Sequence, residues 1–276
     1  MELNIIKNTI KAGLDKPVTF IQMTDSHFTF EDEERDSGRW DCYEPLDNKG
    51  QSEQTFRKIV EYAKQNNYLI VHTGDVTDFL SKANLKFLDE NFKDLDYMLA
   101  AGNHDFCHWV GEATEDHAYK WEMMKRIAPH HKTNLYFDSR LVGGVNIVTM
   151  DDSYYLITDG QIDMLKAEVA KGYPIILCMH VPLYAEGLAS KAAGNEKYLV
   201  CAPSELLDTY SEYRKFQQTP DEATIRAVEY IKNEPLIKAL LTGHRHVNNE
   251  EYLDSGLLQL TTNGSFSGTI REITVI

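Results

Sequence analysis

The chain has 276 residues, a formal net charge of −15 at pH 7 and 42% hydrophobic residues. This composition is that of a soluble globular protein, and the acidic balance argues against broad nucleic-acid binding, which needs a basic face. No apolar run approaches the roughly 18 residues of a membrane span, and the N-terminus lacks the pattern of a secretory signal. Scattered cysteines without C-x-x-C spacing predict free thiols in a reducing, cytoplasmic compartment: Cys42, Cys107, Cys178 and Cys201.

In chain order, residues 2–10 predict an opening strand, with a turn at Gly13. Apolar side chains at i, i+3, i+4 and i+7 spacing then predict helices. These stripes comprise Phe56, Ile59, Val60 and Ala63; Leu85, Leu88 and Phe92 after Ser81; Trp121, Met124 and Ala128; and Ile162, Leu165 and Val169. A further helix is expected to begin at Thr219-Pro220-Asp221-Glu222, as a capping box with proline at the first helical position. Residues 251–276 predict strands, with turns at Asp254-Ser255-Gly256 and Asn263-Gly264.

Five apolar runs that predict strands each end in a polar motif. The pairs are Val18–Met23 with Asp25-Ser26-His27, Tyr68–Val71 with Gly74-Asp75-Val76-Thr77-Asp78, Tyr97–Ala101 with Gly102-Asn103-His104-Asp105, Ile175–Met179 with His180, and Leu236–Leu241 with Gly243-His244-Arg245-His246. In an open α/β sheet, ligands bind beyond the carboxyl ends of the strands. The motifs are therefore expected to meet at one edge.

Strands alternate with helices through most of the chain, which predicts the α/β class, with antiparallel additions from the tail. No linker or internal repeat is visible, so we expect one domain over residues 1–276. Two polar insertions, at about 28–52 and 183–218, follow strands at the ends that carry the polar motifs. Their Arg, Lys and Tyr residues are expected to form walls that set substrate choice, although solvated loops over the core are an equal alternative.

The motifs offer carboxylate, imidazole and amide groups without a thiolate, which suits Mn²⁺, Fe or Zn²⁺. Asp25 and His27 are two residues apart, so in an extended chain their side chains share one face and can chelate one ion. Alone, each motif is an ordinary turn or strand end. Together and in this order they predict a site for two divalent metals.

The ordered set D-x-H, G-D-x-x-D, G-N-H-D, H and G-H-x-H, from Asp25 to His246, resembles the calcineurin-like metallophosphoesterase superfamily. The resemblance implies two mixed β-sheets packed face to face with helices outside. It also implies one ion held by Asp25, His27, Asp75 and His246, and a second held by Asp75, Asn103, His180 and His244. His104 is implied as the general acid, Asp105 is expected to orient its imidazole, and Asp78 is expected to fix a ligand histidine.

The sequence thus predicts a cytoplasmic two-metal phosphohydrolase. It would cleave a phosphodiester or phosphomonoester of a small molecule by attack of a metal-bridging hydroxide. A protein phosphatase and a nuclease of the same superfamily are alternatives, as is a non-catalytic interaction scaffold. Retention of His104 and every ligand weighs against the scaffold, which needs neither. The sequence does not indicate an oligomeric state.

Overall fold

Two β-sheets form the centre of the molecule in the computed structural model, which describes residues 2–30, 51–107, 117–192, 194 and 196–276. The first sheet has the order β1 (Asn4–Ile10), β11 (Thr269–Val275), β2 (Val18–Met23), β3 (Ile70–His72) and β4 (Tyr97–Leu99). The second has the order β5 (Phe137–Val142), β6 (Val145–Met150), β7 (Ile175–Cys178), β8 (Ile237–Thr242), β10 (Leu258–Thr261) and β9 (Asn249–Tyr252). Both sheets mix parallel and antiparallel pairs, which confirms the predicted class and architecture.

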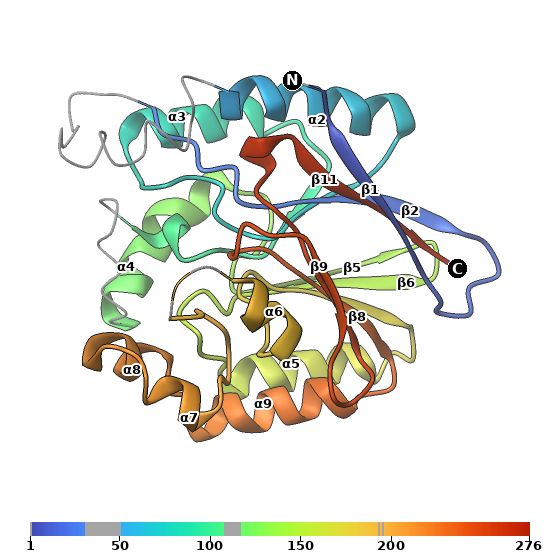
Figure 1. Ribbon diagram of the computed structural model, residues 1–276. Helices are drawn as coiled ribbons and strands as arrows, with labels where there is room; N and C mark the ends of the chain where they lie inside the picture. The colour runs from blue at the N-terminus through green and yellow to red at the C-terminus, as the bar shows by residue number, and fades with distance from the viewer. Residues whose placement is uncertain (1, 31–50, 108–116, 193, 195) are drawn as a thin grey trace.

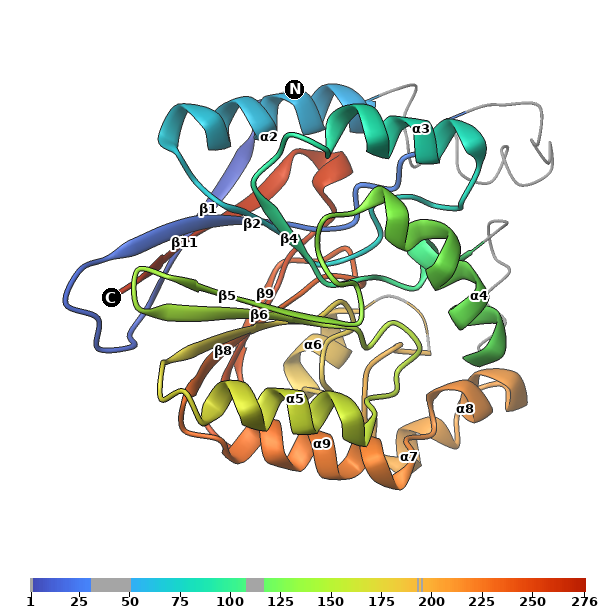
Figure 2. The same cartoon turned by 180° about the vertical axis from the view of Figure 1, so that it is seen from behind.

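Helices cover the outer face of each sheet. Figures 1 and 2 show α2 (Gln51–Asn66) and α3 (Lys82–Asn91) over the first sheet, and α5 (Asp159–Val169) and α9 (Glu222–Asn233) over the second. The remaining elements are η1 (His104–Phe106), α4 (His117–Ile127), η2 (Ala128–His130), α6 (Glu186–Lys191), α7 (Ser204–Leu207), α8 (Glu212–Gln218) and η3 (Ser265–Ser267). None of the helices among the described residues combines the length and apolarity needed to cross a membrane.

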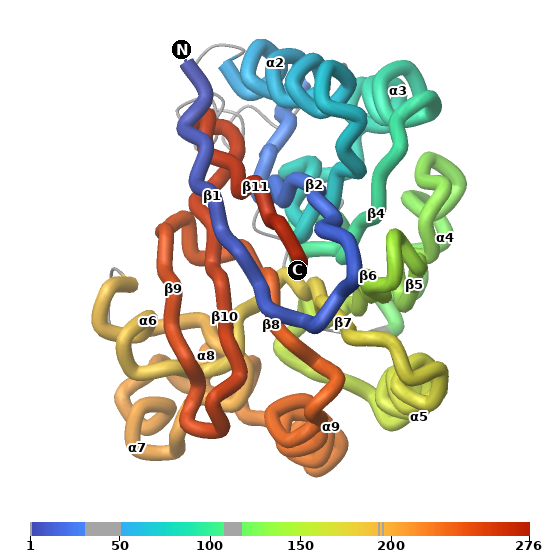
Figure 3. The backbone as a smooth tube through the Cα atoms, turned by 90° about the vertical axis from the view of Figure 1, so that its right-hand side faces the viewer, coloured from blue at the N-terminus to red at the C-terminus, as the bar shows by residue number. Residues whose placement is uncertain are grey.

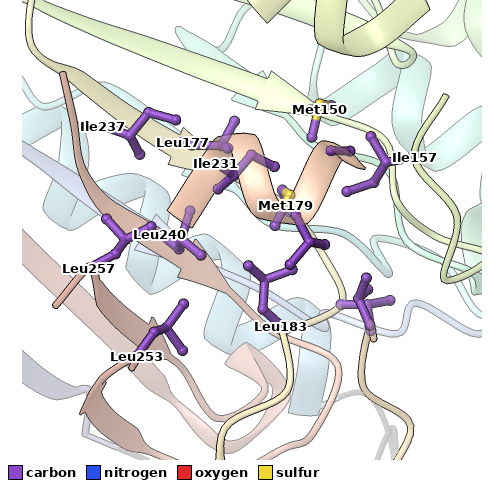
Figure 4. Close-up of a cluster of buried hydrophobic side chains, with 14 of the residues drawn as sticks. Met150, Ile157, Leu177, Met179, Leu183, Ile231, Ile237, Leu240, Leu253 and Leu257 are labelled. Carbon is purple, nitrogen blue, oxygen red and sulfur yellow. The ribbon is translucent and has the colours of Figure 1, made fainter. Parts of the chain in front are cut away.

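Figure 3 shows four layers, two of helices and two of strands. Side chains alternate between the two faces of each strand, so apolar side chains pack in all three spaces between these layers. Ile70 packs under α2 and α3, while its neighbour Val71 faces the second sheet. In the same way, Ile176 faces the first sheet, and Leu177 packs against the helices on the opposite side. Figure 4 shows that outer cluster, in which Ile231 of α9 lies against the side chains of β7 and β8.

Two helix starts test the sequence patterns. The helix expected from Ser81 is α3, and Ser81 is its N-cap, because its side chain accepts a hydrogen bond from the backbone of Asn84 at 3.0 Å. The expected capping box at residues 219–222 is wrong. Asp221 is the N-cap of α9 and accepts from the backbone of Thr224 at 2.7 Å, so the preceding proline lies outside the helix.

The insertion over residues 183–218 forms the three short helices α6, α7 and α8. A parallel β-bridge between Leu183 and Val200 closes its first part, so Val200 returns close to the end of β7. Most of the other predicted insertion, residues 31–50, lies outside the described residues, and so does Cys42. The three described cysteines form no disulfide.

Candidate metal centre

The polar motifs converge where the carboxyl ends of two groups of parallel strands meet. β2, β3 and β4 run parallel in the first sheet, and β7 and β8 run parallel in the second. The sequence pattern suggested one edge of one sheet, whereas the structure forms the site between two sheets. Every predicted ligand takes part in a close contact here: Asp25, His27, Asp75, Asn103, His180, His244 and His246.

Asp25, His27 and His246 form the first candidate ligand group. The Nε2 atoms of His27 and His246 lie 3.0 Å apart, and His246 Nε2 lies 3.1 Å from Asp25 Oδ1. His27 Nε2 lies 3.6 Å from the same carboxylate oxygen. One oxygen and two nitrogens thus face a common point, a donor set that suits Mn²⁺, Fe or Zn²⁺.

The second candidate group consists of Asp75, His180 and His244, with Asn103 beside it. His180 Nε2 lies 3.1 Å from Asp75 Oδ2, 3.2 Å from Asn103 Oδ1 and 3.2 Å from His244 Nδ1. Asp75 Oδ2 also lies 3.8 Å from His27 Nε2 of the first group. This oxygen is therefore common to both groups, which is the geometry that a bridging ligand needs.

Hydrogen bonds on the far side of each ligand fix which atom faces the centre. His180 Nδ1 lies 2.7 Å from the carbonyl oxygen of Thr73, which can only accept, so Nδ1 carries the hydrogen and Nε2 faces the site. His27 Nδ1 contacts Asp78 Oδ1, the kind of contact expected for Asp78. Such partners orient metal-binding histidines and select their tautomer.

The two aspartate ligands are held in a similar way. Asp25 Oδ2 accepts the hydroxyl of Thr24 at 2.6 Å and the backbone N–H of His244 at 3.0 Å, which leaves Oδ1 for the centre. Asp75 Oδ1 accepts the backbone N–H of His104 at 2.8 Å, which leaves Oδ2. One oxygen of each carboxylate is thus committed to the scaffold.

The buried carboxylates and imidazoles of the site shift one another's pKa values. Burial alone would raise the pKa values of Asp25 and Asp75, but the neighbouring imidazoles hold both below the usual range. Burial alone would lower the pKa of His27 and His180, yet the surrounding carboxylates hold the first well above its usual value and bring the second to about 10. The pKa of His244 is lowered by burial and by the charge of its neighbour His180.

The donor set fits a divalent metal. In neutral His180 the hydrogen is on Nδ1 against a carbonyl oxygen, so the Nε2 lone pair points at two oxygen acceptors, Asp75 Oδ2 and Asn103 Oδ1. Three acceptors that face one another repel unless a proton or a cation lies between them. A metal ion satisfies all three, and the same holds for the carboxylate and imidazoles of the first group.

Backbone conformation marks the same residues. Five of the expected ligands have positive φ angles between 48° and 65°: Asp25, His27, Asp75, His244 and His246. Residues other than glycine seldom adopt this region, and such strain gathers at functional sites. Glycine permits the close packing of these loops: a Cβ on Gly243 would lie 1.9 Å from Thr24 Oγ1, and one on Gly102 would lie 2.2 Å from Asp75 Oδ1.

His104 lies at the rim, with 20% of its side chain exposed and its Nδ1 3.5 Å from Asp78 Oδ1. Asp105 differs from the expectation that it orients this imidazole. Both of its carboxylate oxygens accept backbone N–H groups, at 2.9 to 3.2 Å, from Asp75, Val76, Thr77 and Gly102. Asp105 thus fastens the loops after β3 and β4, and Asp78 is the carboxylate beside His104.

Sequence patterns gave little sign of three other residues at the site. Asp152 Oδ1 accepts the backbone N–H groups of His180 and Val181 at 2.9 and 3.1 Å, although its position after β6 was the only hint. Phe266 packs edge-on against His246, with ring centroids 5.1 Å apart, and belongs to none of the motifs that the sequence pattern singled out. His72 of β3 is fully buried and its Nε2 lies 2.9 Å from Ser26 Oγ.

Comparison with known proteins gives the same family as the motifs. A family model described as calcineurin-like phosphoesterase matches residues 18–248. No curated protein matches the chain. Among solved structures, a dimetal phosphatase from Danio rerio superposes with a TM-score of 0.53 at 13% identity, covering 90% of this chain and 88% of that one.

Two further solved structures are more distant. GAP50, the anchor in the inner membrane complex of Plasmodium, has a TM-score of 0.47 at 13% identity, covering 91% of this chain and 72% of that one. A putative 5′-nucleotidase from Staphylococcus aureus has a TM-score of 0.43 at 12% identity, covering 91% and 49%. At such identities the likeness to the zebrafish phosphatase shows the fold alone.

Proposed function

The chain belongs to the calcineurin-like phosphoesterase family, and from that premise we propose that it is a metal-dependent phosphohydrolase acting on a phosphodiester or phosphomonoester of a small molecule. The observation that carries the proposal is the pair of candidate ligand groups that share Asp75 Oδ2. A scaffold that had lost its chemistry would need neither the shared oxygen nor the strained loops around it.

We assign the first ion to Asp25, His27, Asp75 and His246, and the second to Asp75, Asn103, His180 and His244. When bound, such a pair activates water at neutral pH and offsets the charge on phosphoryl oxygens. Mn²⁺, Fe and Zn²⁺ all suit the donor set, and the cytoplasmic location stays a prediction of the sequence.

The chain's own proton donor is His104. It lies at the exposed rim, beside Asp78, and its ring packs edge-on against the ligand His27 with centroids 5.0 Å apart. From here its imidazole can give a proton to the leaving alkoxide oxygen of the substrate, which is the task of a general acid. Asp78 lies beside both His104 and His27 and so links the acid to the first ligand group.

The test uses protein reconstituted with Mn²⁺ and then freed of excess metal. Elemental analysis should approach two ions per chain, and the protein should hydrolyse bis(p-nitrophenyl) phosphate or p-nitrophenyl phosphate. His130→Ala is a matched control, because His130 pairs with Asp89 away from the centre. A folded protein that binds no metal would overturn the site assignment, whereas two bound ions without hydrolysis of either ester would favour the scaffold.

A further inference from the structure

A group of aromatic and cationic side chains borders the second candidate ligand group; we call it the tyrosine–arginine cluster (Tyr155, Tyr198, Arg214 and Arg245). The hydroxyl of Tyr155 lies 3.4 Å from His244 Nε2, the ring atom opposite the one that faces the centre. The ring centroid of Tyr198 lies 6.3 Å from that of His244. The cluster therefore begins at the metal ligand itself and extends outward.

Two guanidinium groups lie beside one ring in this cluster. The Cζ atom of Arg245 is 5.3 Å from the ring centroid of Tyr198, and that of Arg214 is 5.1 Å from the same centroid. Arg245, Arg214 and Tyr198 are all partly exposed, so they remain within reach of a ligand. In a chain with a net charge of −15, two guanidinium groups on the ring that borders His244 are a local concentration of positive charge that favours an anionic ligand, although Glu196 lies beside one of them.

The cluster is assembled from separate segments of the chain that are held in unusual conformations. Tyr155 follows β6, Tyr198 and Arg214 belong to the insertion over residues 183–218, and Arg245 follows β8. Tyr155 and Tyr198 have φ angles of 63° and 54°, which are rare for bulky residues and persist only where the surrounding structure imposes them.

The insertion is fastened so that Tyr198 stays near the centre. Tyr184 donates its backbone N–H to the carbonyl of Val200 at 2.9 Å, and Val200 donates to Pro182 at 2.9 Å. Glu196 accepts the hydroxyl of Tyr198 at 2.8 Å, which fixes the direction of the ring. This carboxylate also lies 3.9 Å from Arg214 Nε, so it helps to place that side chain as well.

We propose that the tyrosine–arginine cluster binds a second phosphate group, carried on the non-reacting part of the substrate. The planar guanidinium fork matches phosphate oxygens, and Arg245 stands between two ligands of the centre, so it can bind a group only a short distance from the reacting phosphorus. This inference rests on the proposed phosphohydrolase function and narrows its substrate to small molecules that carry two phosphates.

The test compares n-butyl phosphate with 1,4-butanediol and 1,6-hexanediol bisphosphates. Each compound is titrated calorimetrically into Mn²⁺-loaded protein and is also used as a competitor of bis(p-nitrophenyl) phosphate hydrolysis. We expect at least one bisphosphate to bind roughly 10 to 100 times more tightly than the monophosphate, the range that one or two hydrogen bonds to a charged group provide. Equal binding of all three compounds would overturn the inference.

Three variants then locate the effect. Arg245→Gln and Arg214→Gln should each reduce the advantage of the bisphosphate at least several-fold, whereas Arg226→Gln, which removes an exposed arginine of α9, should retain it. If both cluster variants kept the advantage, the second phosphate would bind elsewhere. Should Arg245→Gln lose metal because its neighbours are ligands, Arg214→Gln alone decides. Failure of the proposed function is a separate result, namely no turnover of either nitrophenyl ester while calorimetry still reports binding.

Discussion

The two sheets bring different chemistry to the candidate centre. The loops after β2, β3 and β4 supply every carboxylate and the amide, whereas the loops after β7 and β8 supply only imidazoles. Each candidate ligand group combines residues from both sheets: Asp25 and His27 meet His246, and Asp75 meets His180 and His244. Because both assigned groups draw ligands from both sheets, metal binding is expected to hold the two sheets together.

The sheets also fasten their loops unequally. Asp105 accepts four backbone N–H groups with two oxygens on the first sheet's side, and Asp152 accepts two N–H groups with a single oxygen on the second sheet's side. Gln22 of β2 links the two sides by donating to the backbone carbonyl of Thr242 at 3.0 Å. The loops on the first sheet's side are therefore held by more carboxylate–backbone hydrogen bonds than those on the second sheet's side.

The largest expected effect comes from Asp75→Asn, which alters the one oxygen that both groups share. Metal content should fall from two ions towards one or none, and activity should fall on the order of 10³-fold, because metal charge stabilisation is worth several kcal/mol. Mn²⁺ should raise the melting temperature of the wild type but raise that of the variant much less. Asp159→Asn, an exposed change on α5, is the control and should behave as the wild type.

An unchanged metal content in Asp75→Asn would contradict the shared-ligand arrangement. If the variant bound both ions but Mn²⁺ no longer raised its melting temperature, the ions would bind independently of the contact between the sheets.

Much of this arrangement could be predicted from the sequence, because each motif directly follows an apolar run. The strands before Asp25, Asp75 and His180 were all expected, because a short apolar run is a local signal for a buried strand. The role of Asp105 could not be predicted. Its four amide partners are set by how two loops fold together, and adjacency to His104 in sequence suggested a different neighbour. The cluster around Tyr198 likewise depends on segments that only the tertiary fold brings together.

His104→Ala should lose about 10²- to 10⁴-fold in the hydrolysis of alkyl esters while it keeps its metal. Because His104 belongs to the first sheet's side but is not a ligand there, this variant separates proton donation from metal binding. The loss should shrink for nitrophenyl esters, whose leaving group needs little protonation. Equal losses on alkyl and nitrophenyl esters would mean that His104 is not the leaving-group acid.

Asp105→Asn and Asp152→Asn compare how much the loop hydrogen bonds of these two carboxylates contribute to stability. In Asp105 both oxygens accept N–H groups, so an amide nitrogen at either position removes two bonds and should cost about 3 kcal/mol or more of unfolding free energy. In Asp152 a single oxygen accepts both bonds, so asparagine can retain them and should cost about 1 kcal/mol. Urea unfolding of the metal-free proteins measures both values, and equal costs would contradict the unequal fastening.

The smallest expected effect is that of Glu272→Gln, which probes a residue of β11 rather than the loops that carry the ligands. Glu272 in β11 accepts the hydroxyl of Tyr62 from α2 and lies 3.0 Å from Lys7 Nζ. Burial alone would raise the pKa of Glu272, but these two partners hold it below its usual range. Since the folded protein favours the charged form, the carboxylate stabilises the fold above the unfolded pKa of about 4.3, and this stability is lost as the pH falls through the folded value.

We therefore expect Glu272→Gln to cost about 0.5 to 1 kcal/mol of unfolding free energy at pH 7, and this cost should shrink as the pH falls through the lowered pKa of folded Glu272 and the carboxylate becomes protonated. The bond to Lys7 should contribute little, because 71% of that side chain is exposed. Tyr62→Phe, alone and combined with Glu272→Gln, completes a double-mutant cycle that isolates the tyrosine bond. Metal content should stay at the wild-type level in all three variants. A change in bound metal would show that β11 is coupled to the centre, and the site would then depend on the strands of the first sheet as well as on its loops.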